Sequence, residues 1–138
     1  SLTSVLTLRE RQVRELLPEV QDLAAVPADG TLADVQAVTR EHGHMRVLVR
    51  DGETTVGVVH VRDTLDEPDL SRAAMDLARP PVLLPADTGL ATALNQLRQA
   101  RTQIAVVTDA DTELGVITLS DVLPGLMPTA IIDAASAT

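Results

Sequence analysis

Gly57-Val-Val-His-Val-Arg-Asp63 and Gly115-Val-Ile-Thr-Leu-Ser-Asp121 share one pattern, in which a glycine, two apolar residues and three variable residues precede an aspartate. The two stretches lie 58 positions apart, and residues 26–65 align with residues 84–123 at the same shift without a gap. The aligned stretches are identical at 13 of 40 positions. Because a repeat fixes the architecture of the chain that contains it, we expect two copies of one small unit.

The amino-acid composition restricts both the kind of core and the kind of partner. The chain has 138 residues, of which 45% are hydrophobic and none is Phe, Trp or Tyr, so the core must be aliphatic. A net charge of −9 and the absence of stacking rings argue against a nucleic-acid partner. Cysteine and lysine are absent, which excludes disulfides, thiolate chemistry and Schiff bases. No apolar run reaches the roughly 20 residues of a membrane span, so we expect a soluble piece of intracellular type.

Each copy is expected to fold as a strand, a helix, two further strands and a short helix. In the first copy, Thr31–His42 has apolar residues on one face, opens with a Thr-x-x-Asp capping box and is followed by Gly43. The ranges 45–50 and 56–61 are separated by a polar turn, as in a β-hairpin. The second copy repeats these features at 90–97, 103–108 and 114–119.

The predicted fold class is α+β, with two pseudo-symmetric units that each have a small sheet with helices on one face and that pack as one module. Two helices are expected outside the copies, namely Leu8–Leu17, which Pro18 ends, and Asp69–Ala78, which Pro80-Pro81 ends. The predicted division of the chain is a linker helix in 1–19, a first repeat in 20–66, a connecting helix in 67–80, a second repeat in 81–128 and a tail in 129–138.

The repeated motif places an aspartate in the first turn of a helix that follows a buried strand. The helix dipole favours a carboxylate there, and such an acid can accept hydrogen bonds from a vicinal diol. Thr118, three residues before Asp121, would lie beside free helix N–H groups, which suits a phosphate. An aspartate at this position can also serve only as a helix cap, and that alternative stays open.

The motif, its repetition and the elements before it resemble the CBS domain, which occurs in tandem as a Bateman module. The resemblance covers about residues 20–127. Within the family, the chain is similar in particular to the CBS pairs of CorC/HlyC-type magnesium and cobalt efflux and haemolysin-like proteins. Ala28–Asp34, Arg40–His44 and the lead-in Thr7–Pro18 carry this narrower likeness. The resemblance implies a module at the cytoplasmic face of the inner membrane that binds an adenine nucleotide, AMP or ATP, and regulates an attached ion-transport domain.

The second copy has the full set of residues that the family uses at its nucleotide site. The resemblance implies that Asp121 holds the ribose hydroxyls and that Thr118 contacts ribose or phosphate. Val116 would form an aliphatic wall for the adenine. The other residues that the resemblance places at the same cleft are Gln103, Ile104 and, from the first copy, Thr31.

The first copy matches the family in part, because Asp63 is present but His60 stands where the family has Thr or Ser. His60 could donate a hydrogen bond to a phosphate, or it could fill the pocket and leave the first site empty. The arginines that could neutralise a phosphate are Arg46, Arg62, Arg98 and Arg101. Mg²⁺ that bridges ATP phosphates to an aspartate is another route, and no tightly bound cofactor is expected.

The main alternative is a ligand-free structural module, because CBS pairs can associate through their helices into homodimers. The candidates for that contact are Leu65, Met75, Leu77 and Leu123. A metal site at His42 and His44 lacks a third ligand in the sequence. No catalytic constellation is evident, so the chain is not expected to be an enzyme.

Overall fold

The computed structural model describes residues 10–127 and divides them into two compact units. The first-repeat unit consists of residues 20–81. The second-repeat unit consists of residues 82–127 together with residues 10–19, which precede the first copy in the chain. None of the helices in this part of the chain is both long and apolar enough to cross a membrane.

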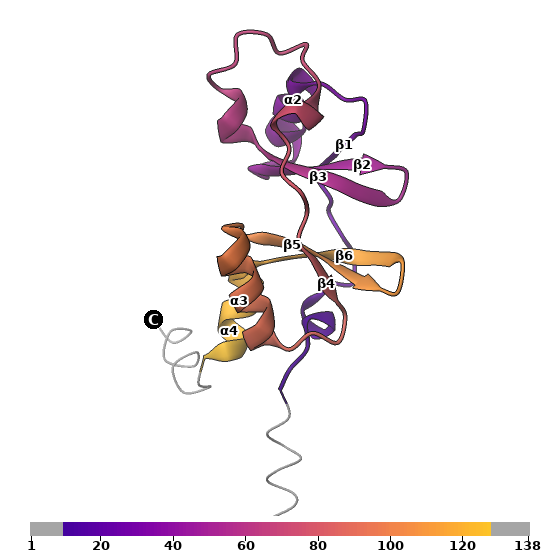
Figure 1. Cartoon of the computed structure of the whole chain (residues 1–138), viewed down its shortest axis with the longest axis vertical. Coiled ribbons are helices and arrows are strands. Elements are labelled where there is room, and N and C mark those ends of the chain that lie inside the picture. Colours follow the sequence, from indigo (N-terminus) through magenta and orange to yellow (C-terminus); the bar gives the residue numbers. More distant parts are fainter. Residues whose placement is uncertain (1–9, 128–138) are drawn as a thin grey trace, which may run out of the picture. The chain divides into compact units, whose positions relative to one another are not determined.

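The first-repeat unit has a three-stranded sheet in the order β1-β2-β3. β1 (Ala25–Pro27) pairs in parallel with β2 (Arg46–Asp51), and β2 pairs antiparallel with β3 (Thr54–His60). Helix α2 (Leu32–His42) connects the two parallel strands and lies on one face of the sheet (Figure 1). Parallel neighbours require such a crossover, whereas a short turn is enough for the antiparallel pair.

The second-repeat unit repeats this architecture. Its elements are β4 (Leu83–Pro85), α3 (Leu90–Ala100), β5 (Ile104–Asp109), β6 (Thr112–Thr118) and α4 (Leu119–Leu126). The strand register matches at the shift of 58, because Val26 lies opposite Val49 and Leu84 lies opposite Val107. The register also shifts after these same partners, at Val49 and at Val107. The predicted α+β class and the predicted order of elements are confirmed.

Each unit has its own aliphatic core, as the composition required. In both hairpins alternate residues point toward the helices, so that Val47, Val49 and Val59 are fully buried in the first-repeat unit. Residues at the equivalent positions of the second-repeat unit are Ala105, Val107 and Ile117. The helices complete the two cores with the faces that their sequences predicted, through Leu32 and Val35 in α2 and through Leu90, Ala93 and Leu97 in α3.

The two crossover helices begin differently. α2 has the capping box that its sequence predicted, because the Asp34 carboxylate accepts the Thr31 N–H at 2.9 Å and the Thr31 hydroxyl accepts the Asp34 N–H at 3.2 Å. α3 begins after Gly89, which has no side chain to offer. The carboxylate of Glu10, from the segment before the first repeat, accepts the Ala91 N–H at 2.8 Å and replaces the missing cap.

The expected helices outside the copies are largely absent. Instead of an α-helix over Asp69–Ala78 the structure has the four-residue 3₁₀ helix η3 (Ala74–Leu77), so that prediction is wrong. The described part of Leu8–Leu17 contains the 3₁₀ helix η1 (Val13–Leu16), and residues 1–9 and the tail at 128–138 lie outside the described residues. Backbone groups in both segments bond to a neighbouring loop, which prevents regular helical bonding.

The segments that contain η1 and η3 are equivalent to each other. The Val13 N–H donates to the Thr88 carbonyl at 2.9 Å, and the Ala74 N–H donates to the Gly30 carbonyl at 2.8 Å. Gly30 and Thr88 are themselves equivalent at the shift of 58, whereas positions 13 and 74 differ by 61. In each unit, therefore, a segment outside the gapless sequence alignment forms a backbone hydrogen bond to the loop before the crossover helix.

The helix that follows each motif differs in length. In the first-repeat unit it is the 3₁₀ helix η2 (Val61–Thr64), and in the second-repeat unit it is the eight-residue α4. The sequence predicted a short helix in both places, and the two helices begin where the motif places them. The two motifs therefore reach the same structural position but continue differently.

Candidate functional site

The second-repeat motif brings together residues from two strands and one helix. Ile104, the first residue of β5, lies directly opposite Thr118, the last residue of β6. Val116 lies two residues before Thr118, so it shares a sheet face with Thr118 and with Ile104. Three predicted site residues thus form one patch at the end of the hairpin where α4 begins.

The aspartate of this motif is held against the start of α4. The Thr118 N–H donates to Oδ2 of Asp121 at 2.8 Å, so the acid does cap the helix. A carboxylate has more than one lone pair on each of two oxygens, so this bond leaves capacity for donors from a ligand. Asp121 is exposed, which allows a diol to reach it. The capping role and the binding role are therefore compatible.

Two further residues stand beside Thr118. The carbonyl of Gln103 accepts the Leu119 N–H at 2.8 Å, which ties the entry of β5 to the first residue of α4, while Gln103 itself is exposed. The Thr118 hydroxyl lies 3.5 Å from the hydroxyl of Ser120. Ser120 was not among the predicted site residues, although it occupies one of the three variable positions of the motif.

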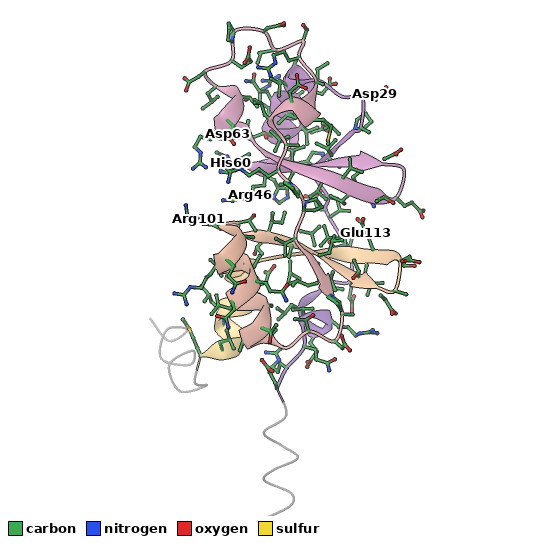
Figure 2. All side chains as sticks on the ribbon, viewed as in Figure 1. Asp29, Arg46, His60, Asp63, Arg101 and Glu113 are labelled. Atoms are coloured by element: carbon green, nitrogen blue, oxygen red, sulfur yellow. The ribbon has the colours of Figure 1, made fainter. Side chains whose placement is uncertain are left out.

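The first-repeat motif has the same backbone frame with different side chains. Arg46, at the start of β2, lies directly opposite His60, at the end of β3. Nδ1 of His60 accepts the Arg62 N–H at 3.0 Å, and Nε of Arg62 lies 3.9 Å from Oδ1 of Asp63. Figure 2 shows Arg46, His60 and Asp63 at the same end of the sheet. His60 therefore caps the following turn in this unit.

The surroundings of His60 favour its neutral form. Partial burial and the guanidinium groups of Arg46 and Arg62 lower the pKa of His60 below its ordinary value of 6.5, and Asp63 opposes this change. A neutral imidazole whose Nδ1 accepts a hydrogen bond carries its proton on Nε2. At neutral pH His60 is therefore a hydrogen-bond donor at the ring atom away from the backbone.

Thr31 is in the first-repeat unit, at the start of α2. Its hydroxyl is part of the capping box, and its backbone lies beside Ala73 in a short bridge. The expectation that Thr31 and the second-repeat motif serve one cleft stays a prediction. The other arginines named for a phosphate lie in the second-repeat unit, Arg98 in the last turn of α3 and Arg101 at the junction with β5.

The two histidines at the end of α2, His42 in its last turn and His44 just after it, have a partner that the sequence did not reveal. Nδ1 of His42 lies 3.1 Å from Oδ1 of Asp22, and Nε2 of His44 lies 3.4 Å from Oδ2 of the same carboxylate. Even so, no group of three or more His, Cys, Asp or Glu residues within 10–127 is arranged to hold a metal ion. We therefore assign these contacts to the surface structure of the first-repeat unit.

Comparison with known proteins identifies the family to which this chain belongs. The family model described as "CBS domain" matches residues 13–69 and 74–127, so the chain belongs to the CBS domain family and contains a tandem pair. It is similar to a UPF0053 protein from the cps region of Klebsiella pneumoniae, at 33% identity over 126 residues, 86% of this chain and 39% of that protein. It is also similar to hemolysin C of Brachyspira hyodysenteriae, at 25% identity over 125 residues, 88% of this chain and 47% of the relative. The chain thus spans less than half the length of these relatives.

Two solved structures have the same fold. The CBS domain of a bacterial CNNM/CorC family Mg²⁺ transporter, in complex with ATP, gives a TM-score of 0.76 at 33% identity and covers 90% of this chain and 92% of its own. A CBS domain protein from Pyrobaculum aerophilum, complexed with AMP, gives a TM-score of 0.73 at 21% identity, with 93% and 100% of the two chains covered. The second likeness concerns the fold alone. The resemblance to CBS pairs of the CorC and haemolysin-like group is confirmed.

Proposed function

We propose that this chain is a regulatory, non-catalytic module that binds an adenine nucleotide, AMP or ATP, and controls an attached membrane domain that transports ions. One observation carries the proposal. Ile104, Val116, Thr118 and Asp121 converge at one end of the second-repeat hairpin, with an exposed acid held beside a hydroxyl. The likeness at 33% identity to a transporter CBS domain in complex with ATP supports the same ligand class.

The roles follow from the chemistry of each group. Asp121 accepts hydrogen bonds from the ribose diol, and the hydroxyls of Thr118 and Ser120 donate to ribose or phosphate oxygens. Ile104 and Val116 supply an aliphatic surface for the base, because the chain has no aromatic residue on which a base could stack. Mg²⁺ that accompanies ATP would supply positive charge against its phosphates.

The proposed partner is a membrane domain of the same parent protein, and the proposed location is the cytoplasmic face of the inner membrane. The relatives at 39% and 47% coverage are more than twice as long as the matched part, which leaves room for such a domain. Nucleotide binding regulates the partner only if the ligand binds two arrangements of the module with different affinity.

Isothermal titration calorimetry with AMP, ADP and ATP, each with and without Mg²⁺, tests the ligand class. We expect saturable binding of at least one of them to the folded chain. The chain has no Trp or Tyr, so a 260 nm absorption of purified material free of nucleic acid would independently reveal bound nucleotide. A folded chain that binds none of the three at millimolar concentration would refute the proposal.

Asp121→Asn is the variant that tests the site. It keeps an oxygen for the Thr118 N–H, so the helix cap survives, but it removes the charge that strengthens the bonds to ribose. We expect the affinity for nucleotide to fall by about tenfold or more. Asp111→Asn removes an exposed acid from the hairpin turn of the same unit and should leave the affinity unchanged. Equal losses in both variants would show that overall charge, and not the motif, determines binding.

Exposed apolar side chains favour a second candidate, a structural dimerisation module. Leu65 is 69% exposed, Met75 39% and Leu123 37%, whereas Leu77 packs against the core of its own unit and is removed from the candidates. A homodimer through these side chains is compatible with nucleotide binding. Sedimentation analysis of the wild type and of Leu65→Ser separates the two candidates, because only the structural function requires a stable dimer without ligand.

A further inference from the structure

The first-repeat motif concentrates positive charge in a chain whose net charge is −9. The side chains of Arg46 and His60 lie opposite each other on one face of the β2–β3 pair, and cross-strand neighbours of this kind have Cβ atoms about 5 Å apart. Arg62 follows two residues after His60 and bonds to its ring through the backbone N–H. Two arginines and one histidine are therefore clustered at the end of this sheet, and the charges of both arginines act on the His60 ring.

This positive charge is only partly balanced. Within the described residues Arg46 takes part in no ion pair, and Arg62 pairs with its neighbour Asp63 at 3.9 Å with 70% of its side chain exposed. An exposed pair of this kind contributes little, so both guanidinium groups stay available to a ligand. Burial and these same two guanidinium groups lower the pKa of His60, because a third positive charge beside Arg46 and Arg62 is unfavourable.

The second-repeat unit lacks this charge at the equivalent positions. Ile104 replaces Arg46, Thr118 replaces His60 and Ser120 replaces Arg62, while Asp121 and Asp63 are the same residue. The backbone frame is shared, since both hairpins have the same register. The two motifs therefore present different chemistry, neutral hydroxyls in one and cations with a ring N–H donor in the other.

We propose that Arg46, His60 and Arg62 form a binding site for a polyphosphate group, and not a second ribose site. Two guanidinium groups can each form paired hydrogen bonds with phosphate oxygens, and Nε2 of His60 adds a third donor. A di- or triphosphate matches two positive charges better than a single phosphate does. That the group belongs to a nucleotide rests on the proposed function; free pyrophosphate offers the same chemistry.

The test follows the His60 imidazole by NMR while pyrophosphate is added to the full chain in buffer without Mg²⁺, at constant ionic strength. A bound polyanion should shift the His60 ring signals in a saturable way and raise the pKa of His60, because negative charge favours the imidazolium. His42 and His44, the other two histidines of the chain, are internal controls that should not respond. Unchanged His60 signals at 10 mM pyrophosphate, about the upper limit for a specific site, would overturn the proposal.

The second repeat supplies the matched substitutions. Arg46→Ile and Arg62→Ser introduce the residues that the equivalent positions already tolerate, and each should weaken pyrophosphate binding about tenfold or more. Arg40→Gln removes an exposed arginine from α2 and should change nothing. Circular dichroism confirms that each variant is folded. Equal weakening by Arg40→Gln would mean that the response is a nonspecific charge effect, which would also overturn the proposal.

Titrations with ATP and AMP separate this proposal from the nucleotide proposal. If both hold, ATP shifts the His60 signals at lower concentration than AMP, and Asp121→Asn weakens ATP binding without changing the response to pyrophosphate. A response to pyrophosphate with no response to ATP would support the polyphosphate site and count against the nucleotide function. Binding of ATP, with His60 signals that respond to neither ATP nor pyrophosphate, would support the nucleotide function and refute the polyphosphate site.

Discussion

At the scale of single residues, the two hairpin turns differ at the position that has left-handed backbone. Gly52 and Ala110 are equivalent, and both have left-handed backbone, with φ of 60° and 53°. A Cβ at position 52 would meet no atom within 4 Å, so the turn itself leaves space for a side chain. The difference between the two turns is therefore almost purely conformational. Left-handed backbone costs a non-glycine residue about 1 kcal/mol or more.

Ala110→Gly should accordingly stabilise the protein by about 1 kcal/mol or slightly less. The gain is reduced because glycine has more conformational freedom than alanine in the unfolded chain. Urea unfolding measures the free energy of unfolding. Gly52→Ala is the reciprocal variant and should destabilise by a similar amount. A stability loss in Ala110→Gly would show that the Ala110 methyl group makes contacts that outweigh its strained backbone.

The candidate site illustrates how far single residues could be predicted. The motif alone predicted Asp121 in the first turn of a helix and Thr118 at the end of a strand. This was possible because the change from strand to helix is visible in a few consecutive residues. The bond from the Arg62 N–H to His60 and the pairing of Arg46 with His60 could not be predicted in the same way. The bond to His60 depends on the rotamer of its ring, and the pairing of Arg46 with His60 depends on the strand register. Neither can be derived from the residue types alone.

At the scale of elements, the motif glycine of the first repeat has a packing reason. A Cβ at Gly57 would stand 2.8 Å from the Ala78 Cβ and 3.2 Å from the Met75 sulfur. These residues lie in the segment around η3, which runs beside β3 and exchanges two backbone hydrogen bonds of 2.9 Å between Val58 and Arg79. Glycine thus allows this segment to approach the sheet closely.

Gly57→Ala should destabilise the protein by about 1–3 kcal/mol, because the added methyl group overfills this contact. Ala78→Gly removes the nearest atom, so the double variant should recover part of the loss. The interaction energy comes from a double-mutant cycle of urea unfolding measurements. If the two substitutions are simply additive, the close approach to Ala78 is not the reason for the glycine.

Elements were predictable to the extent that their hydrogen bonds are local. α2, α3 and the two hairpins follow from periodicity and turn residues, and their ends lie within three residues of the expected ones. The segments of η1 and η3 were predicted as α-helices from composition and a following proline. Their backbone groups bond instead to the loops at Gly30 and Thr88, which no periodicity records.

At the scale of the whole molecule, residues 10–19 precede the first repeat in sequence but belong to the second-repeat unit. Val13 is fully buried in the core of that unit, and the Leu90 N–H donates to the Arg11 carbonyl at 3.1 Å. Glu10 caps α3 through the Ala91 N–H. A force applied to the chain before residue 10 therefore acts first on the start of α3, in the unit that contains Thr118 and Asp121.

Val13→Ala tests this connection, because it removes two buried methyl groups from the second-repeat core while leaving the first-repeat core intact. We expect a loss of about 2 kcal/mol and faster hydrogen exchange in α3 and in β4 to β6, measured by mass spectrometry. Val20→Ala, at a side chain that is 83% exposed, should leave exchange unchanged in both units. Faster exchange that is confined to residues 20–81, or equal in the two units, would show that the lead-in does not belong to the second-repeat unit. Exchange that rises only in the second-repeat unit would mean that the buried Val13 side chain links residues 10–19 to the stability of the unit that contains the proposed ribose site.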